Sequence, residues 1–225
     1  MRRRPYLGIA LVTLRDVSVA VRADTPEWPG DTPFSCRWAW AKAQGASVNV
    51  SAITMSPHVG THADAPLHVR DGWPGSHELP LEPFHGRATL VDASARTGEI
   101  SLAQLEALAD LTTVERLLVR TGRTIAAGTF PADWPTLTEA CVRALLGRGL
   151  RLLGVDAPSV DTRESTTLAV HHMLFEGGAF NLENLDLRRV PAGEYELIAF
   201  PIRLMSLDAA PVRAVLRPLG AGGGA

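Results

Sequence analysis

Short runs rich in β-branched and aliphatic residues, separated by turns with glycine, proline or aspartate, are the feature that most restricts how this chain can fold. Such runs predict strands at residues 17–21, 47–54, 88–92, 114–119, 150–155 and 194–204. Helical patterns are fewer. Ser101 and Gln104 form a capping-box pattern before leucines at helical spacing, and a second helix is expected after Thr136 or Thr138. Strands with interspersed helices predict a mixed α/β or α+β domain.

The length and charge of the chain limit its organisation and its partners. Its 225 residues suit one large domain, with 22 Lys and Arg against 24 Asp and Glu. Such a balance provides no field for a polyanion, so neither a nucleic acid nor an anionic membrane is an expected partner. No apolar run approaches the ~20 residues of a membrane helix, so we expect a soluble, cytoplasmic protein.

The two ends of the sequence differ from the middle. Residues 1–16 are interpreted as an extension leading into the first strand, 17–219 as the domain, and 220–225 as a flexible glycine-rich tail. The apolar stretch 7–14 follows three arginines, but Arg15 and Asp16 interrupt it, which argues against an export signal. That stretch is a candidate for burial against a partner subunit.

Thiol chemistry is not expected. Cys36 and Cys141 are far apart and outside any Cys-x-x-Cys pair, so both are predicted to be small buried hydrophobic residues. No Gly-x-Ser-x-Gly element is present either, which argues against a serine hydrolase elbow.

Residues 56–68 contain most of the side chains in this sequence that are candidates for metal binding or proton transfer. Of the seven histidines in the chain, His58, His62 and His68 lie here together with Asp64. Neutral imidazole nitrogens and a carboxylate are the ligand set of zinc and related divalent metals. The segment is rich in turn residues, so we do not expect it to form regular structure. It therefore predicts a metal site on a loop.

Geometry requires a bend within this segment. In an extended chain His58 and His62 would lie about 13 Å apart at ~3.3 Å per residue, too far to share one ion comfortably. Gly60 permits the bend because it adopts positive φ without steric cost. Pro57 and Pro66 argue against a continuous helix, so the spacing of the two histidines is not that of a helical metalloprotease pair.

The segment resembles a known signature. His58-x-Gly-Thr-His62-x-Asp64-x-Pro-x-His68 matches every fixed position of the metal-dependent cyclase family, which includes bacterial kynurenine formamidases and isatin hydrolases. Further blocks at residues 28–34, 120–121, 154–161, 183–185, 195–199 and 208–216 resemble the kynurenine formamidase branch. The resemblance covers about residues 17–219 and implies a single compact α/β domain around a mixed, β-barrel-like sheet with flanking helices.

The resemblance also implies two divalent metal ions per subunit, zinc before manganese. One ion is held by the positions of His58, His62 and Asp64, and the aspartate bridges to a second ion at the positions of His171 and Glu183. The family separation of histidine and glutamate selects His171 from the His171-His172 doublet. If residues 168–175 are helical, the two rings point about 100° apart, so His172 is expected outside the site.

Further roles follow from the same resemblance. His68 matches the proton donor and acceptor, although a third metal-ligating histidine remains an alternative. Trp28, in the irregular loop 24–34, matches a substrate-contacting position; without the resemblance it could be a hydrophobic plug. His77 and His85 match nothing in the signature. Thr166 stands where this branch is expected to carry lysine, which leaves the specificity near the second metal less secure.

The function implied is hydrolysis of N-formyl-L-kynurenine to L-kynurenine and formate in tryptophan breakdown, by a metal-activated water with His68 protonating the leaving nitrogen, in a homodimer. An isatin hydrolase, which opens a cyclic amide, is the nearest alternative. A metal- or ligand-binding protein without catalysis is another alternative. The presence of His68 at the expected offset from the ligands argues against it, because a purely structural site would close its coordination sphere with protein ligands.

Overall fold

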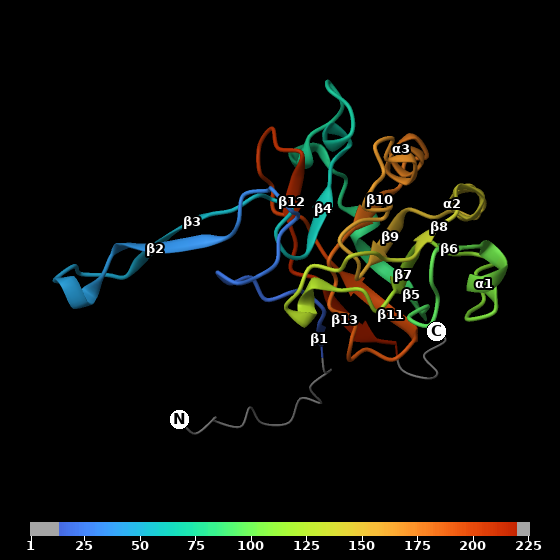
Figure 1. Cartoon of the computed structure of the whole chain (residues 1–225), viewed down its shortest axis with the longest axis horizontal. Helices are drawn as coiled ribbons and strands as arrows, with labels where there is room; N and C mark the ends of the chain where they lie inside the picture. Colours follow the sequence, from blue (N-terminus) through green and yellow to red (C-terminus); the bar gives the residue numbers. More distant parts are fainter. Residues whose placement is uncertain (1–13, 220–225) are drawn as a thin grey trace.

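A mixed sheet organises the residues that the computed structural model describes, 14–219. Seven strands follow the order β1-β13-β11-β5-β7-β9-β10 (Figure 1). The strands of this sheet are β1 (Arg15–Asp16), β5 (His85–Asp92), β7 (Arg116–Arg120), β9 (Leu152–Val155), β10 (Phe180–Leu182), β11 (Gly193–Ile198) and β13 (Val215–Pro218). From β5 to β10 neighbouring strands are parallel, and from β5 to β1 they are antiparallel.

Smaller elements surround the sheet. Three two-stranded pairs join β2 (Ser35–Trp40) to β3 (Val50–Thr54), β4 (His62–Asp64) to β12 (Ala209–Pro211), and β6 (Glu99–Ile100) to β8 (Thr136–Leu137). The α-helices are α1 (Leu102–Glu106), α2 (Glu139–Gly147) and α3 (Ala169–Glu176). No helix of residues 14–219 is both long and apolar enough to cross a membrane.

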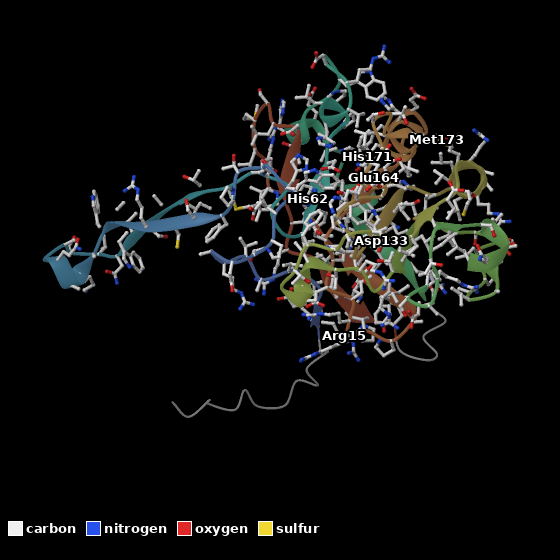
Figure 2. All side chains as sticks on the ribbon, in the orientation of Figure 1. Arg15, His62, Asp133, Glu164, His171 and Met173 are labelled. Atoms are coloured by element: carbon white, nitrogen blue, oxygen red, sulfur yellow. The ribbon has the colours of Figure 1, made fainter. Side chains whose placement is uncertain are left out.

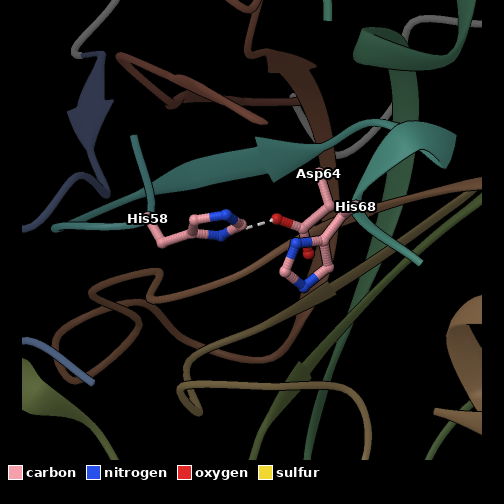
Figure 3. Close-up of side chains that lie close together, drawn as sticks. All are labelled: His58, Asp64 and His68. Atoms are coloured by element: carbon pink, nitrogen blue, oxygen red, sulfur yellow. Dashed lines mark ion pairs between the residues drawn. The ribbon is translucent and has the colours of Figure 1, made fainter. Parts of the chain in front are cut away.

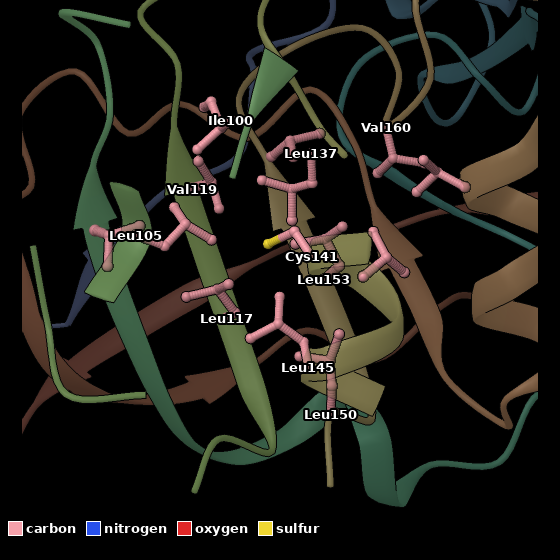
Figure 4. Packing of buried hydrophobic residues seen from close by; sticks show 14 of the residues in the cluster. Ile100, Leu105, Leu117, Val119, Leu137, Cys141, Leu145, Leu150, Leu153 and Val160 are labelled. Carbon is pink, nitrogen blue, oxygen red and sulfur yellow. The ribbon is translucent and has the colours of Figure 1, made fainter. Parts of the chain in front are cut away.

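Side chains of the central strand, β7, are buried on both faces of the sheet. Leu117 and Val119 of β7 pack into a cluster with α1 and α2, which includes Leu105 and Leu145 (Figure 4). Leu118, between them, belongs to the cluster on the opposite face. Because successive side chains of a strand point to opposite faces, two buried faces require an apolar run, and residues 117–119 form one between Arg116 and Arg120.

The expected α/β fold is confirmed, with an open half-barrel rather than a closed barrel, since the strand order ends at β1 and β10. Both helix starts are also confirmed. The Ser101 hydroxyl accepts from the backbone N–H of Gln104, whose side chain accepts from the N–H of Ser101, and Thr138 caps α2. Residues 169–176 form a helix, as the argument about the histidine doublet assumed.

Several strand predictions were wrong in extent. Residues 17–21 form only one bridge, at Ser18, because backbone groups there bind loops and side chains, such as Val19 N–H to Thr61 Oγ1 (2.9 Å). The strand expected to end at residue 204 ends at Ile198, shortly before Pro201, which lacks an N–H. Residues 47–54 form a strand only from Val50.

Other features were missed or differ. The segment 56–68 contains β4 and a 3-10 helix (Pro66–His68), although no regular structure was expected there. Sequence patterns also missed β2, β10, β12 and β13. Cys141 is buried as predicted, whereas Cys36 is exposed because it lies on β2, whose residues are all exposed. The apolar residues 7–13 and the tail 220–225 lie outside the described residues.

Candidate metal centre

Strand β4 contains two of the predicted ligands, His62 and Asp64, and lies beside a third, Glu183. The chain turns at Gly60, with φ of 76°, so the bend expected there is present. Beyond it, His62 pairs with Pro211 of β12 and forms a bridge with Glu183, which directly follows β10. The backbone N–H of His62 donates to the Glu183 carbonyl (3.3 Å), and the reverse bond is 3.0 Å. These bonds fix the two side chains next to each other.

His62, Asp64 and Glu183 form one buried group that could hold a metal ion, with ligand atoms within 4.8 Å of one another. His62 Nε2 lies 3.3 Å from Asp64 Oδ1 and 3.5 Å from Glu183 Oε2. His171 Nε2, from α3, lies 3.2 Å from both Asp64 Oδ2 and Glu183 Oε1. Figure 2 places His62 and His171 in the same part of the molecule. His172 instead lies beside Trp73, with ring centroids 5.9 Å apart.

A second group shares Asp64. It consists of His58, Asp64 and His68, and Figure 3 shows their side chains converging. His58 Nδ1 lies 3.0 Å from Asp64 Oδ1, and the ring centroids of His58 and His68 are 4.5 Å apart. The structure therefore brings His68 close enough to be counted among possible ligands. Its role as a third ligand stays an alternative to its role in proton transfer.

The electrostatics of both groups favour positive charge among these carboxylates. Burial lowers the pKa of His58, but the neighbouring carboxylates of Asp208 and Asp64 outweigh this effect and raise the pKa to about 9. Burial of His62 is outweighed in the same way by Asp64 and Glu183, which raise its pKa to about 10. Conversely, burial raises the pKa of Asp64, yet the surrounding histidines hold it well below its ordinary value. A cation suits this environment.

Two buried polar atoms without hydrogen-bond partners indicate whether a metal ion would fit among these side chains. His62 Nε2 and Asp64 Oδ1 have no hydrogen-bond partner among the described residues, and they face each other at 3.3 Å. Buried polar atoms are seldom left unpaired, because the desolvation cost of each is about 1–3 kcal/mol. Imidazole nitrogens with carboxylate oxygens are the donors of zinc, manganese and related ions. The residues therefore fit a divalent metal.

Sequence reasoning missed the residues that hold these side chains in place. Asp161 Oδ2 lies 2.6 Å from His171 Nδ1, and its carboxylate also accepts from the first backbone N–H groups of α3. Asn181 donates through Nδ2 to Asp64 (2.7 Å) and Glu183 (3.0 Å). Both residues are separated from residues 56–68 by more than 90 positions, so no local pattern connects them.

Asp208 is a further residue without an assigned role at the sequence level. Its Oδ2 lies 2.9 Å from His58 Nε2 and 3.5 Å from His68 Nδ1. These contacts hold the pKa of the Asp208 carboxyl well below its usual range. The residue immediately precedes β12, and its only sequence signal was its place in the C-terminal block of the resemblance.

A cavity of about 300 Å³ opens onto the two groups. Trp28 forms one wall, with edge contacts to Phe130 (5.5 Å between centroids) and Trp134 (5.9 Å). Phe130 was not anticipated. The cavity is lined by Pro26, Glu27, Trp28, Asp31, His58, His62, His68, Phe130, Pro158, Ser159, Leu168, His171, Glu183 and Asn184. An aromatic wall that faces candidate metal ligands suits an aromatic substrate with a hydrolysable group.

The other singled-out residues lie elsewhere. His77 accepts the backbone N–H of Ser206, and the exposed His85 lies 3.5 Å from Glu196. Thr166 is exposed and does not line the cavity.

Comparison with known proteins gives the family. The profile described as "Putative cyclase" matches residues 15–162. The curated kynurenine formamidase of Bordetella avium (strain 197N) is 43% identical, over 92% of this chain and 99% of that protein. The kynurenine formamidase of Bacillus thuringiensis (strain Al Hakam) is also 43% identical, over 91% of this chain and 97% of that protein.

Solved structures agree on the fold. A potential metal-dependent hydrolase with cyclase activity is 26% identical, covers 91% of this chain and 96% of that chain, and has a TM-score of 0.77. Isatin hydrolase A from Ralstonia solanacearum shares the fold, with 20% identity and a TM-score of 0.76. The match covers 91% of this chain and 91% of that chain. The chain therefore belongs to the cyclase family of metal-dependent hydrolases, and within it to the kynurenine formamidase branch.

Proposed function

We propose that this chain hydrolyses N-formyl-L-kynurenine to L-kynurenine and formate, a step of tryptophan breakdown. One observation carries the proposal: buried histidines and carboxylates that fit a divalent metal face a cavity with an aromatic wall. The identity of 43% to curated kynurenine formamidases, over almost the whole of both chains, selects the aryl formamide as substrate.

The metal ligands are proposed in two sets. His58, His62 and Asp64 hold one divalent ion, and Asp64, His171 and Glu183 hold another, with zinc as the first candidate. When bound, such ions lower the pKa of a coordinated water toward ~7 and polarise a carbonyl oxygen. The short contacts of Asp64 with all three histidines support its role as the shared ligand.

His68 is proposed to carry the proton. Its Nδ1 faces Asp208 at 3.5 Å, Nε2 has no hydrogen bond among residues 14–219, and the side chain is 30% exposed and lines the cavity. An imidazole in this position can donate a proton to the aniline nitrogen as the C–N bond breaks. Trp28 and Phe130 are proposed to hold the aromatic ring of the substrate against the wall of the cavity.

A side-by-side assay tests the proposal. Purified protein, analysed for its metals, is given N-formyl-L-kynurenine and isatin, before and after treatment with a chelator. We expect formamide cleavage to exceed isatin opening, to disappear after chelation and to return when zinc or manganese is added. Full formamidase activity in metal-free protein would refute the metal-dependent mechanism, and preferred opening of isatin would refute the substrate.

A homodimer is also proposed, supported by the arm that β2 and β3 form. The arm extends away from the sheet (Figure 1) and exposes Trp38 (62%), Trp40 (60%) and Ile53 (62%). A two-stranded hairpin is marginally stable alone in water, so such an arm is expected to pack against another surface. Sedimentation of the wild type and of a Trp38→Glu variant measures the oligomeric state. A monomeric wild type would contradict the proposal.

A further inference from the structure

Two carboxylates share the cavity with the metal-ligating side chains. Glu27 and Asp31 both line it, on either side of Trp28 in the loop 24–34, and both are half-buried. Neither lies within 4.0 Å of a lysine, arginine or histidine nitrogen among residues 14–219. Asp31 accepts only the backbone N–H of Thr32 (2.6 Å). By contrast, Asp24 of the same loop lies 3.9 Å from Arg22 and does not line the cavity.

The lining of the cavity also includes an independent, deeply buried acceptor. Asn184 is 5% exposed, and its Oδ1 finds no hydrogen-bond partner among the described residues. Its backbone is fixed in a left-handed conformation (φ 55°), with its carbonyl accepting from Thr61 Oγ1 (2.6 Å) and its N–H donating to Ala157 (3.0 Å). The side-chain oxygen of Asn184 is therefore left for a donor from water or from a ligand. With Glu27 and Asp31 it adds a third acceptor to the lining of the cavity, which favours a ligand that donates hydrogen bonds.

Charge adds to this preference. A carboxylate accepts hydrogen bonds and donates none, and withdrawing it from water is costly unless a cation is near. Nearby Arg163 lies over the Phe130 ring, 5.7 Å from its centroid, without pairing with either carboxylate. A ligand that offers an ammonium group therefore complements Glu27 and Asp31 better than a neutral or purely anionic one.

We propose that Glu27 and Asp31 bind the α-ammonium group of the substrate and make the enzyme selective for formamides that carry an amino-acid side chain. This inference rests on the proposed formamidase function. N-formyl-L-kynurenine carries its formamide and its acyl chain on neighbouring carbons of one aromatic ring, and the ammonium group stands beside the α-carboxylate at the end of that chain. With the formamide at the metal-ligating residues and the ring against Trp28, the ammonium group reaches the two carboxylates that flank that tryptophan.

The test compares two formamides on metal-loaded full-length protein. One is N-formyl-L-kynurenine, and the other is 4-(2-formamidophenyl)-4-oxobutanoate, in which hydrogen replaces the α-amino group. The variants are Glu27→Gln, Asp31→Asn and the double variant, with Asp24→Asn as the matched control from the same loop. Circular dichroism and the thermal midpoint verify that each variant is folded.

The wild type is expected to prefer the amino acid in kcat/KM. Because half-buried ion pairs contribute about 0.5–1.5 kcal/mol, each substitution is expected to reduce this preference about twofold to tenfold, through KM rather than kcat. Raising the salt concentration should weaken the preference of the wild type and leave that of the double variant unchanged. Asp24→Asn should keep the wild-type preference.

The outcomes separate the inference from the function on which it rests. Cleavage of both formamides with the same preference in the wild type and the double variant would overturn the inference alone. If the wild type cleaves neither formamide, the proposed function fails and the inference fails with it. A competitive inhibition constant for L-kynurenine that is equal in the wild type and the double variant would also overturn the inference, independently of turnover.

Discussion

Replacing Asp161 by asparagine tests whether the proposed metal binding depends on a residue outside the proposed ligand set. The Asp161 carboxylate lies 2.6 Å from His171 Nδ1 and accepts the backbone N–H groups of Val170 (3.0 Å) and His171 (3.1 Å). This arrangement places the proton on Nδ1 and leaves Nε2 directed toward Asp64 and Glu183. In Asp161→Asn the geometry can persist, but the charge that supports all three bonds is lost.

The magnitude follows from the contacts. Hydrogen bonds to charged groups contribute about 1.5–3 kcal/mol. Loss of a carboxylate that orients a metal-ligating histidine typically weakens metal binding about 10- to 100-fold, equivalent to about 1.4–2.7 kcal/mol. Although burial lowers the pKa of His171, its hydrogen bond to Asp161 raises that pKa above the ordinary value. The substitution therefore also lowers the pKa of His171, and protons compete less with the metal ion for its ring. We therefore expect the lower half of this range.

Competition with a chromogenic chelator measures the affinity for zinc, and calorimetry measures the shift of the thermal midpoint on adding zinc. Asp156→Asn is the matched control, because Asp156 is equally buried and accepts from Thr121 (2.5 Å) and Gly122 (3.0 Å) without touching the histidines. We expect the control to lose stability and keep its zinc affinity. The reasoning is refuted if Asp161→Asn binds zinc as tightly as the wild type.

Three further predictions follow. His68→Ala should keep its metals and lose about 10²- to 10⁴-fold in kcat, against no change in His77→Ala; loss of metal would instead make His68 a ligand. In chelated protein, the pKa values of about 9 for His58 and about 10 for His62 exceed the ordinary 6.5. The protonated rings therefore stabilise the fold fully below pH 6.5, and this contribution, about 1.4 kcal/mol per pKa unit, is lost as the pH rises through 9 to 10. The thermal midpoint of chelated protein should fall over that range, and a constant midpoint would contradict the assigned ion pairs. Leu117→Ala should lower the free energy of unfolding in urea by about 2–5 kcal/mol, since Leu117 is completely buried, and a loss below 1 kcal/mol would argue against the central position of β7.

The sequence predicted best where a local pattern decides the structure. The apolar runs of β5, β7 and β9 were found because burial on both faces requires continuous hydrophobicity. Ser101 and Thr138 marked helix starts because their hydroxyls bind backbone N–H groups within the next turn. Gly60 marked the bend because positive φ excludes most other residues.

Prediction from the sequence failed where the structure of a segment depends on residues far away in the chain. Strand β4 forms because β12 supplies its partner groups, and the two are separated by more than 140 residues. The residues of β2 are all exposed, so burial within this chain gives no reason to expect a strand there. Asp208 and Asp161 acquire their contacts only through the tertiary fold, so composition and spacing contain no physical signal for them.

The pairing of β4 with β12 has a consequence for biosynthesis. His62 and Asp64 leave the ribosome early, but their strand is held by Ala209–Pro211, and the remaining carboxylates and histidine come from residues 171–208. Contacts between residues so distant in sequence form late, after the intervening chain has closed its loops. Under the proposed ligand set, loading with an ion would follow synthesis of nearly the whole domain, and a nascent chain arrested before residue 208 should release zinc to a weak chelator that the finished protein resists.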